Sequence, residues 1–198
     1  MLALTFYLIR IYRQARFDGI MNKAKSKRFF RYTIGILLLI LVIGYCLPQP
    51  FVMPVKGAGQ NSYAQNSFWF YPWGKSVTHK GVDVFAKAGT DVIAATPGLV
   101  IRTGTLKRGG NMVLVLGPKW RFHYYAHLKE IKTSSFHFVK KGSVIGSVGN
   151  TGNAAGKPAH LHYAISSMLP LPWRMDKTKQ GWKKMFFLNP VKYLNTFQ

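Results

Sequence analysis

Two histidines two residues apart, His160 and His162, are the side chains best placed to carry chemistry. They stand in the apolar run HLHYAI, which is typical of a β-strand. Because successive side chains of a strand alternate between its faces, both imidazoles point to one side and Leu161 points to the other. Such a pair can bind a metal ion, or it can be two hydrogen-bonded histidines on a half-exposed face. The rest of the chain has to distinguish these alternatives.

A second pair, His79 and Asp83, stands in the segment HKGVD. Gly81 and the β-branched Val82 disfavour a helix, so we expect a loop that carries His79 and a strand that carries Asp83. Fully extended residues four positions apart lie about 13 Å from one another, so the chain must bend, and Gly81 permits the bend. Asp83 is one of only five acids in the chain. The pair can supply two metal ligands or form a simple histidine–carboxylate contact.

His127 is the third candidate, at the end of the strand-like run RFHYYAHL. Strand alternation places His123 on the same face as His127. For His123 and His137 no partner is evident in the sequence, and we expect both to be structural or exposed. The sole cysteine, Cys46, excludes an internal disulfide and a cysteine-rich zinc site. Any metal ligands must therefore be histidine and aspartate.

The charge of the chain points to an anionic partner. Among 198 residues, 28 Lys and Arg oppose five Asp and Glu, which gives a net charge of +23. Nucleic acid, anionic lipid and anionic cell-wall polymers are the usual partners of so basic a protein. A nucleic-acid binder would explain the charge but neither the histidines nor the apolar N-terminal run, and the strands carry no recognised binding signature. We therefore expect no nucleic-acid partner.

The segment from His79 to Ile165 has the texture of a β-domain. Short apolar runs are separated by Gly and Pro, with no helical stretch between them, and this pattern indicates an all-β, antiparallel domain. We expect that domain over residues 77–169. The strand-like runs are VDVFA, DVIAA, GLVIRTG, NMVLVLG, RFHYYAHL, SVIGSVG and HLHYAIS.

The flanking segments lack a sustained period. Residues 48–76, which contain several Pro and Gly, are expected to be a linker and a loop-rich entry to the domain. Their aromatic cluster at 68–73 can line a substrate groove, pack in the core or lie on the membrane surface. Residues 170–198 are expected to be a tail that packs on the domain. Within that tail, 182–188 is predicted to form a short helix that Asn189-Pro190 ends.

The N-terminal part of the chain predicts a transmembrane helix. Residues 32–47 are the uncharged run YTIGILLLILVIGYCL, and Phe29 and Phe30 extend it toward the ~20 residues that a bilayer requires. The preceding residues 1–31 carry eight basic side chains against Asp18. This charge predicts that the N-terminal segment stays in the cytoplasm and that the remainder of the chain is translocated.

Several fates of that apolar run are open. No small residues mark a cleavage site close behind it, so an uncleaved signal anchor is favoured. Lipidation of Cys46 is disfavoured, because the preceding Tyr45 is bulky. A start at Met21 would leave a short basic region before the apolar run, as in a secretory signal. Residues 1–20 would then come from an upstream start; otherwise they form a basic segment on the membrane surface.

Three motifs in a fixed order resemble the lysostaphin/LytM-type zinc endopeptidases, which are peptidoglycan hydrolases. The resemblance covers about residues 77–166. The family's fold implies a duplicated-hybrid β-domain, akin to biotinyl/lipoyl-like sheets, around 97–100 and 141–146. The short spacer between Trp73 and His79 departs from the family pattern and leaves the shape of one groove wall open. The motifs are His79-x-x-x-Asp83, Tyr125-x-His127-Leu128, and His160-x-His162 preceded by the loop GNTGNAAG.

The resemblance implies that zinc is bound by His79, Asp83 and His162, with His160 and His127 unliganded beside an open position. Three ligands and a water describe a catalytic zinc, which lowers the pKa of that water to about 7. The only Glu of the chain, at position 130, lies outside the ligand motifs. The general base is therefore expected to be His160, and His127 is expected to stabilise the oxyanion or protonate the leaving amine.

The implied protein is a single-pass, membrane-anchored zinc endopeptidase with its catalytic domain outside the cytoplasmic membrane. Its expected substrate is peptidoglycan, with the peptide cross-link favoured over other bonds. From residue 32 onward 20 Lys and Arg oppose four acids, a net charge of +16 that suits anionic wall polymers or lipid headgroups. The rival interpretation is a catalytically silent module that binds the wall or activates another hydrolase. Such modules commonly lose metal ligands, whereas this chain keeps each of them.

Overall fold

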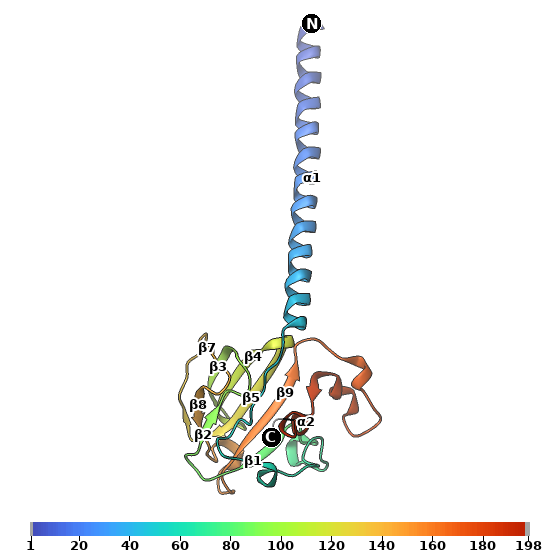
Figure 1. Cartoon of the computed structure of the whole chain (residues 1–198). Coiled ribbons are helices and arrows are strands. Elements are labelled where there is room, and N and C mark those ends of the chain that lie inside the picture. Colours follow the sequence, from blue (N-terminus) through green and yellow to red (C-terminus); the bar gives the residue numbers. More distant parts are fainter. Residues whose placement is uncertain (1, 197–198) are drawn as a thin grey trace. The chain divides into compact units, whose positions relative to one another are not determined.

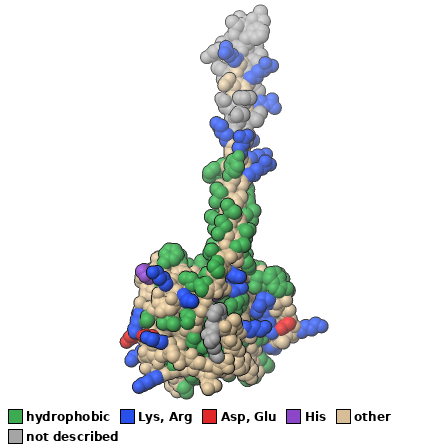
Figure 2. Space-filling model, viewed as in Figure 1, with side chains coloured by type: hydrophobic (Ala, Val, Ile, Leu, Met, Phe, Trp, Pro, Cys, Tyr) green, Lys and Arg blue, Asp and Glu red, His purple; other side chains and the backbone are tan. Residues whose placement is uncertain are grey.

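The computed structural model describes residues 2–196 and divides the chain into two compact units, one up to Gly44 and one from Tyr45 onward. The first unit is helical: α1 runs from Leu2 to Cys46 (Figure 1). Its part Lys25–Cys46 has 22 residues, a mean hydropathy of 2.0 and enough length to cross a membrane. Figure 2 shows hydrophobic side chains gathered on this part of the helix. Signal sequences share these properties, so insertion of α1 in a membrane stays a prediction.

The second unit is a β-domain, as the alternating runs predict. Within the described residues its strands pair antiparallel in a larger and a smaller sheet. The larger sheet has the order β1 (Val82–Phe85), β9 (His160–Ser167), β5 (Arg121–Leu128), β4 (Gly110–Gly117), β3 (Gly98–Leu106), β7 (Phe138–Val139), and β10 (Phe187–Leu188) also pairs with β9. The smaller sheet has the order β2 (Asp91–Ile93), β8 (Val144–Ser147), β6 (Glu130–Ile131). The likeness to biotinyl/lipoyl-type sheets stays a prediction.

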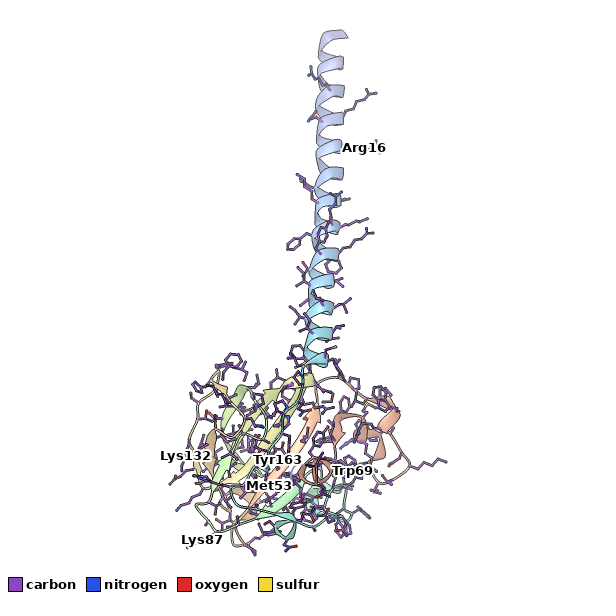
Figure 3. The ribbon with its side chains drawn as sticks, in the orientation of Figure 1. Arg16, Met53, Trp69, Lys87, Lys132 and Tyr163 are labelled. Carbon is purple, nitrogen blue, oxygen red and sulfur yellow. The ribbon has the colours of Figure 1, made fainter. Side chains whose placement is uncertain are left out.

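The core lies on one face of the larger sheet. Leu161, Tyr163 and Ile165 of β9 are fully buried there, which leaves the even-numbered His160 and His162 for the opposite face. Residues 51–55, which the sequence analysis assigned to a linker, contribute to the same core. The ring of Phe51 lies 6.2 Å from that of Tyr163, and Met53, labelled with Tyr163 in Figure 3, packs against the cluster. This segment therefore fixes the start of the second unit against the sheet.

The C-terminal tail packs on the domain through a helix that the sequence analysis did not expect. A 3₁₀ turn spans Gly181–Phe186, inside the segment where a short helix was predicted. Asn189-Pro190, expected to end that helix, instead begins α2 (Pro190–Leu194). The Asn189 side chain accepts a hydrogen bond from the backbone N–H of Val191 at 3.0 Å, and Pro at the first helical position needs no donor there. The prediction that Asn189-Pro190 ends a helix was wrong, because an Asn-Pro pair can equally well begin one.

Candidate metal centre

Strand pairing brings the two halves of the candidate site together. Asp83 of β1 is the direct register partner of His162 of β9, and His79 lies in the loop that leads into β1. Gly81 lets that loop lie against β9: a Cβ atom at this position would stand 2.5 Å from the Tyr163 carbonyl oxygen and 2.8 Å from Cε1 of His162. From the sequence, Gly81 is expected to allow a bend. The structure shows that it also supplies the space for His162.

Three ligand-type atoms converge at this point. Nε2 of His79 lies 3.1 Å from Oδ1 of Asp83 and 3.1 Å from Nδ1 of His162, and the last two atoms are 2.8 Å apart. Tetrahedral zinc ligands with bonds of about 2.0–2.1 Å are separated by about 3.3 Å. The three atoms therefore need to move apart by only a few tenths of an ångström to hold a metal ion. Within residues 2–196 they form the group of His, Asp, Cys and Glu side chains suited to that purpose.

The orientation of His79 is set from its other side. Its Nδ1 lies 3.0 Å from both the carbonyl oxygen and the hydroxyl oxygen of Ser67; the carbonyl can only accept, so a hydrogen bond to it requires the proton on Nδ1. In the neutral ring Nε2 then presents a lone pair to the site. The indole of Trp73 stacks on the His79 imidazole with centroids 4.2 Å apart and the ring is 1% exposed. An outer hydrogen bond of this kind fixes the tautomer and strengthens a metal ligand.

Electrostatics favour a cation at the convergence point. Burial by itself would raise the pKa of the Asp83 carboxyl, but its contacts with the imidazoles of His162 and His79 outweigh burial and hold that pKa well below its usual value. Asp83 is thus an anion at neutral pH. A carboxylate oxygen and two imidazole nitrogens facing one small space attract a positive charge, which either protons or a metal ion can supply.

Two further histidines lie beside these three. Nδ1 of His160 lies 2.8 Å from the carbonyl oxygen of Pro158, and Nδ1 of His127 lies 2.9 Å from that of Thr151. Both Nδ1 atoms therefore donate, and each ring keeps its Nε2 for another partner. The ring centroids of His127 and His160 are 5.1 Å apart, and those of His127 and His162 are 5.9 Å apart. The structure thus gathers all five candidate side chains on one side of the sheet.

His127 reaches this side only because β5 is irregular. Between the partners Val113–Tyr125 and Asn111–Leu128, β4 advances by two residues and β5 by three, so β5 contains a bulge. His127 sits in it with a positive φ of 63°. Bulges re-aim side chains and are frequent beside active sites. Burial, followed by the charge of His162, lowers the pKa of His127 to about 4, so its imidazole is neutral at pH 7.

The expectation that His123 shares a face with His127 is therefore wrong. His123 points to the core, where its Nδ1 lies 2.6 Å from the Tyr163 hydroxyl and its Nε2 lies 3.2 Å from the Gln49 amide nitrogen. Regular alternation would place both histidines together, and the bulge separates them. The expectation that His123 is structural agrees with its complete burial, and His137 is exposed, as expected.

Several residues of the site gave no signal in the sequence. Thr151 contributes through its backbone carbonyl, which any residue type offers, and Ser67 through its carbonyl and its hydroxyl, but no motif marked either residue. The Tyr124 ring stands edge-on to His162 with centroids 6.3 Å apart. Of the aromatic cluster, Trp69 is buried against Phe187, which agrees with a core role, and Trp73 stacks on His79.

Comparison with known proteins identifies the domain. Residues 77–171 match peptidase family M23, and this range contains all five candidate side chains. The β-domain is an M23 peptidase domain. The M23 domain thus confirms the resemblance to lysostaphin/LytM-type peptidases on which the sequence analysis relied.

Individual relatives of the M23 domain agree with this result. The chain is 35% identical over 126 residues to the L-Ala--D-Glu endopeptidase of Bacillus subtilis, covering 58% of this chain and 37% of the relative. It is 33% identical over 90 residues to the peptidoglycan DD-endopeptidase ShyC of Vibrio cholerae, covering 46% of this chain and 20% of the relative. The crystallised catalytic domain of lysostaphin from Staphylococcus simulans has a TM-score of 0.54 at 25% identity, with 68% of this chain and 94% of that chain covered. The chain thus covers 37% of the length of one curated relative and 20% of the other.

Proposed function

We propose that the M23 domain is a zinc endopeptidase that hydrolyses peptide bonds in peptidoglycan. The observation that carries this proposal is the convergence of His79 Nε2, Asp83 Oδ1 and His162 Nδ1 within 4.8 Å of one another, with the imidazoles of two further histidines beside them. The names of the two curated relatives, an L-Ala--D-Glu endopeptidase and a peptidoglycan DD-endopeptidase, support the substrate class.

His79, Asp83 and His162 are the residues that would hold the metal. Three protein ligands leave one tetrahedral position open, which is typical of catalytic rather than structural sites. Zinc bound there would polarise the scissile carbonyl and make hydroxide available near neutral pH. The hydrogen bond from His79 Nδ1 to the Ser67 carbonyl keeps the ligand ring in the required orientation.

His160 has the geometry of a general base. Its Nδ1–H donates to the Pro158 carbonyl, so the lone pair of Nε2 is available to take a proton from water. The ring is only 6% exposed and contacts Phe85, with centroids 5.3 Å apart, which restricts its movement. Glu130 lies on β6 in the other sheet, so it is no candidate for this role.

His127 acts at the other end of the scissile bond. Its Nδ1–H is committed to the Thr151 carbonyl, so Nε2 faces the substrate. If the proton that His160 takes from water passes to this nitrogen, His127 can hydrogen-bond the developing oxyanion or protonate the leaving amine. The bulge in β5 brings this imidazole next to His160.

We place the enzyme at the cytoplasmic membrane, with a single span and the M23 domain on the outer side. The helix Lys25–Cys46 is long and apolar enough to be that span, and the basic segment before it favours a cytoplasmic N-terminus. Figure 2 shows Lys and Arg side chains over the visible face of the domain and few Asp or Glu. This charge suits anionic wall polymers. Among the bonds of peptidoglycan, the peptide cross-link is the proposed target.

The rival function is a silent module that regulates another hydrolase. It is disfavoured because the three ligand-type atoms and both neighbouring imidazoles are present and oriented. Digestion of purified muropeptides by the full chain in detergent, followed by mass spectrometry, distinguishes the two functions. We expect cleaved cross-links that disappear on chelation and return with zinc. Intact muropeptides at full zinc occupancy would contradict the proposal.

A further inference from the structure

The connection between α1 and the β-domain is very short. α1 ends at Cys46, and only Leu47 and Pro48 precede Gln49. Gln49 is already tied to the sheet: its Oε1 accepts a hydrogen bond from Arg121, and its amide nitrogen lies 3.2 Å from Nε2 of His123. Three extended residue steps span at most about 11 Å. The Arg121 end of β5 is therefore held close to the end of the apolar helix, whatever the angle between them.

Exposed aromatic side chains occur at the same end of the sheet. Strand register defines a row across it, in which Phe138 of β7 pairs with Leu99, Leu99 with Leu116, and Leu116 with Phe122, the residue after Arg121. Three strand spacings put Phe138 about 14 Å from Phe122. The side chain of Phe138 is 75% exposed and that of Phe136 is 79% exposed. Figure 1 shows β7 on the same side of the domain as the turn between β4 and β5.

Further apolar and basic side chains belong to the same end of the sheet. Met168, 42% exposed, donates its backbone N–H to the Trp120 carbonyl in the turn after β4. Lys119 stands in that turn, and Lys140 and Lys141, both exposed, follow β7. Large apolar side chains surrounded by cations are the composition that binds the interface of an anionic bilayer, where aromatic rings sit at headgroup depth.

We propose that this end of the M23 domain, defined by Phe136, Phe138, Met168, Lys119 and Lys140, rests on anionic lipid. The inference depends on the proposed membrane anchorage of α1. The short connection carries it, because about 11 Å leaves no room for a protein layer between the end of α1 and the Arg121 end of the sheet. The phenyl rings enter the headgroup region, and the lysines pair with lipid phosphates.

This placement sets the distance between the metal centre and the membrane surface. Ser167 is the register partner of Arg121, and His162 lies five residues earlier on β9. Five strand residues correspond to about 17 Å. The site thus opens at the end of the sheet away from the lipid, and it meets the substrate layer nearest the membrane.

The test uses the full chain in lipid nanodiscs that contain phosphatidylglycerol. In a Cys46→Ser background, one fluorophore is attached at Phe138→Cys, at Leu38→Cys in the apolar helix, or at Lys87→Cys. Lys87 is exposed and follows β1 at the opposite end of the sheet, and Figure 3 labels it. Quenching by aqueous iodide and by a nitroxide on the lipid headgroup is measured for each probe.

We expect the probe at position 138 to be quenched by the headgroup nitroxide and several-fold less by iodide than the probe at position 87. Replacement of phosphatidylglycerol by phosphatidylcholine should weaken this shielding. Equal iodide quenching at 138 and 87, with the probe at 38 shielded, would overturn the inference and leave the anchorage intact. An iodide-accessible probe at 38 would overturn both. Muropeptide cleavage is a separate readout of the proposed hydrolase.

Discussion

Asp83 lies directly opposite His162 in the antiparallel pairing of β1 and β9, and their Oδ1 and Nδ1 atoms are 2.8 Å apart. Strand register, rather than a mobile loop, thus fixes the distance between two of the three proposed ligands. Sites built on paired strands hold their geometry more accurately than sites built on loops. Because His79 is clamped by Ser67 and Trp73, the third ligand is also held before a metal binds.

Loss of a ligand should remove the metal. We expect His79→Ala and Asp83→Ala to lower zinc affinity by about 100-fold or more, because changes at mere outer-shell partners already cost up to that factor. Zinc content by mass spectrometry and competition with a chromophoric chelator measure the effect. His137→Ala, at an exposed histidine outside the site, is the matched control. Full zinc occupancy in both ligand variants would rule out this site.

Replacing His160 should separate chemistry from metal binding. We expect His160→Ala to bind zinc with unchanged stoichiometry and to lose about 10²- to 10⁴-fold in the cleavage rate, the usual contribution of a general base. The measurement pairs zinc content with muropeptide cleavage under identical conditions. If His160→Ala lost its zinc while His162→Ala kept it, the roles of ligand and base would have to be exchanged.

Gly81 offers a test that leaves every ligand in place. Its Cβ in Gly81→Ala would meet the Tyr163 carbonyl oxygen at 2.5 Å, so the loop with His79 must move away from β9. We expect weaker zinc binding in a folded protein, measured by chelator competition alongside circular dichroism. Gly59→Ala is the control, because a Cβ there meets nothing within 4 Å. Wild-type zinc affinity in Gly81→Ala would show that this close approach does not position the ligands.

Acid should destabilise the fold through His123. Burial, reinforced by the charge of Arg121, lowers the pKa of His123 to about 3, whereas an unfolded histidine has a pKa of about 6.5. The unfolded chain therefore binds one more proton between these values. As the pH falls below about 6.5, this residue should remove about 1.4 kcal/mol of unfolding free energy per pH unit, until about pH 3.

Urea unfolding of the full chain in detergent at several pH values measures this slope. We expect His123→Gln to have a flatter dependence on pH than the wild type, whatever its stability at pH 7. His137→Gln, at an exposed position, should keep the wild-type slope. An unchanged slope in His123→Gln would mean that His123 is not held neutral in the folded state.

Much of the β-domain could be predicted from the sequence, because alternation depends on burial alone. All seven strand-like runs form strands, and the two-residue spacing correctly places Leu161 in the core and His160 with His162 on the other face. The short strands β6, β7 and β10 were missed, since two residues carry no period. The burial of Phe51 also escaped, because an irregular segment gives no sign of which residue packs against a sheet.

The site was only partly accessible to sequence reasoning. Residue types and spacing suggested the side chains, but their convergence depends on strand register, which the resemblance supplied and local patterns did not. His127 illustrates the limit. Period-two alternation places it on the same face as His123, whereas the bulge in β5 turns it to the metal centre. That bulge can be recognised only from the pairing of β5 with β4. Backbone carbonyls such as that of Ser67 carry no residue signature at all.

Anomalous diffraction at the zinc absorption edge, from crystals of the full chain grown with zinc, tests the central claim most directly. We expect one strong peak within about 2.2 Å of His79 Nε2, Asp83 Oδ1 and His162 Nδ1, with its fourth position open toward His160 and His127. A peak elsewhere, or a zinc ion that also takes His160 or His127 as a ligand and so closes the site, would contradict the account.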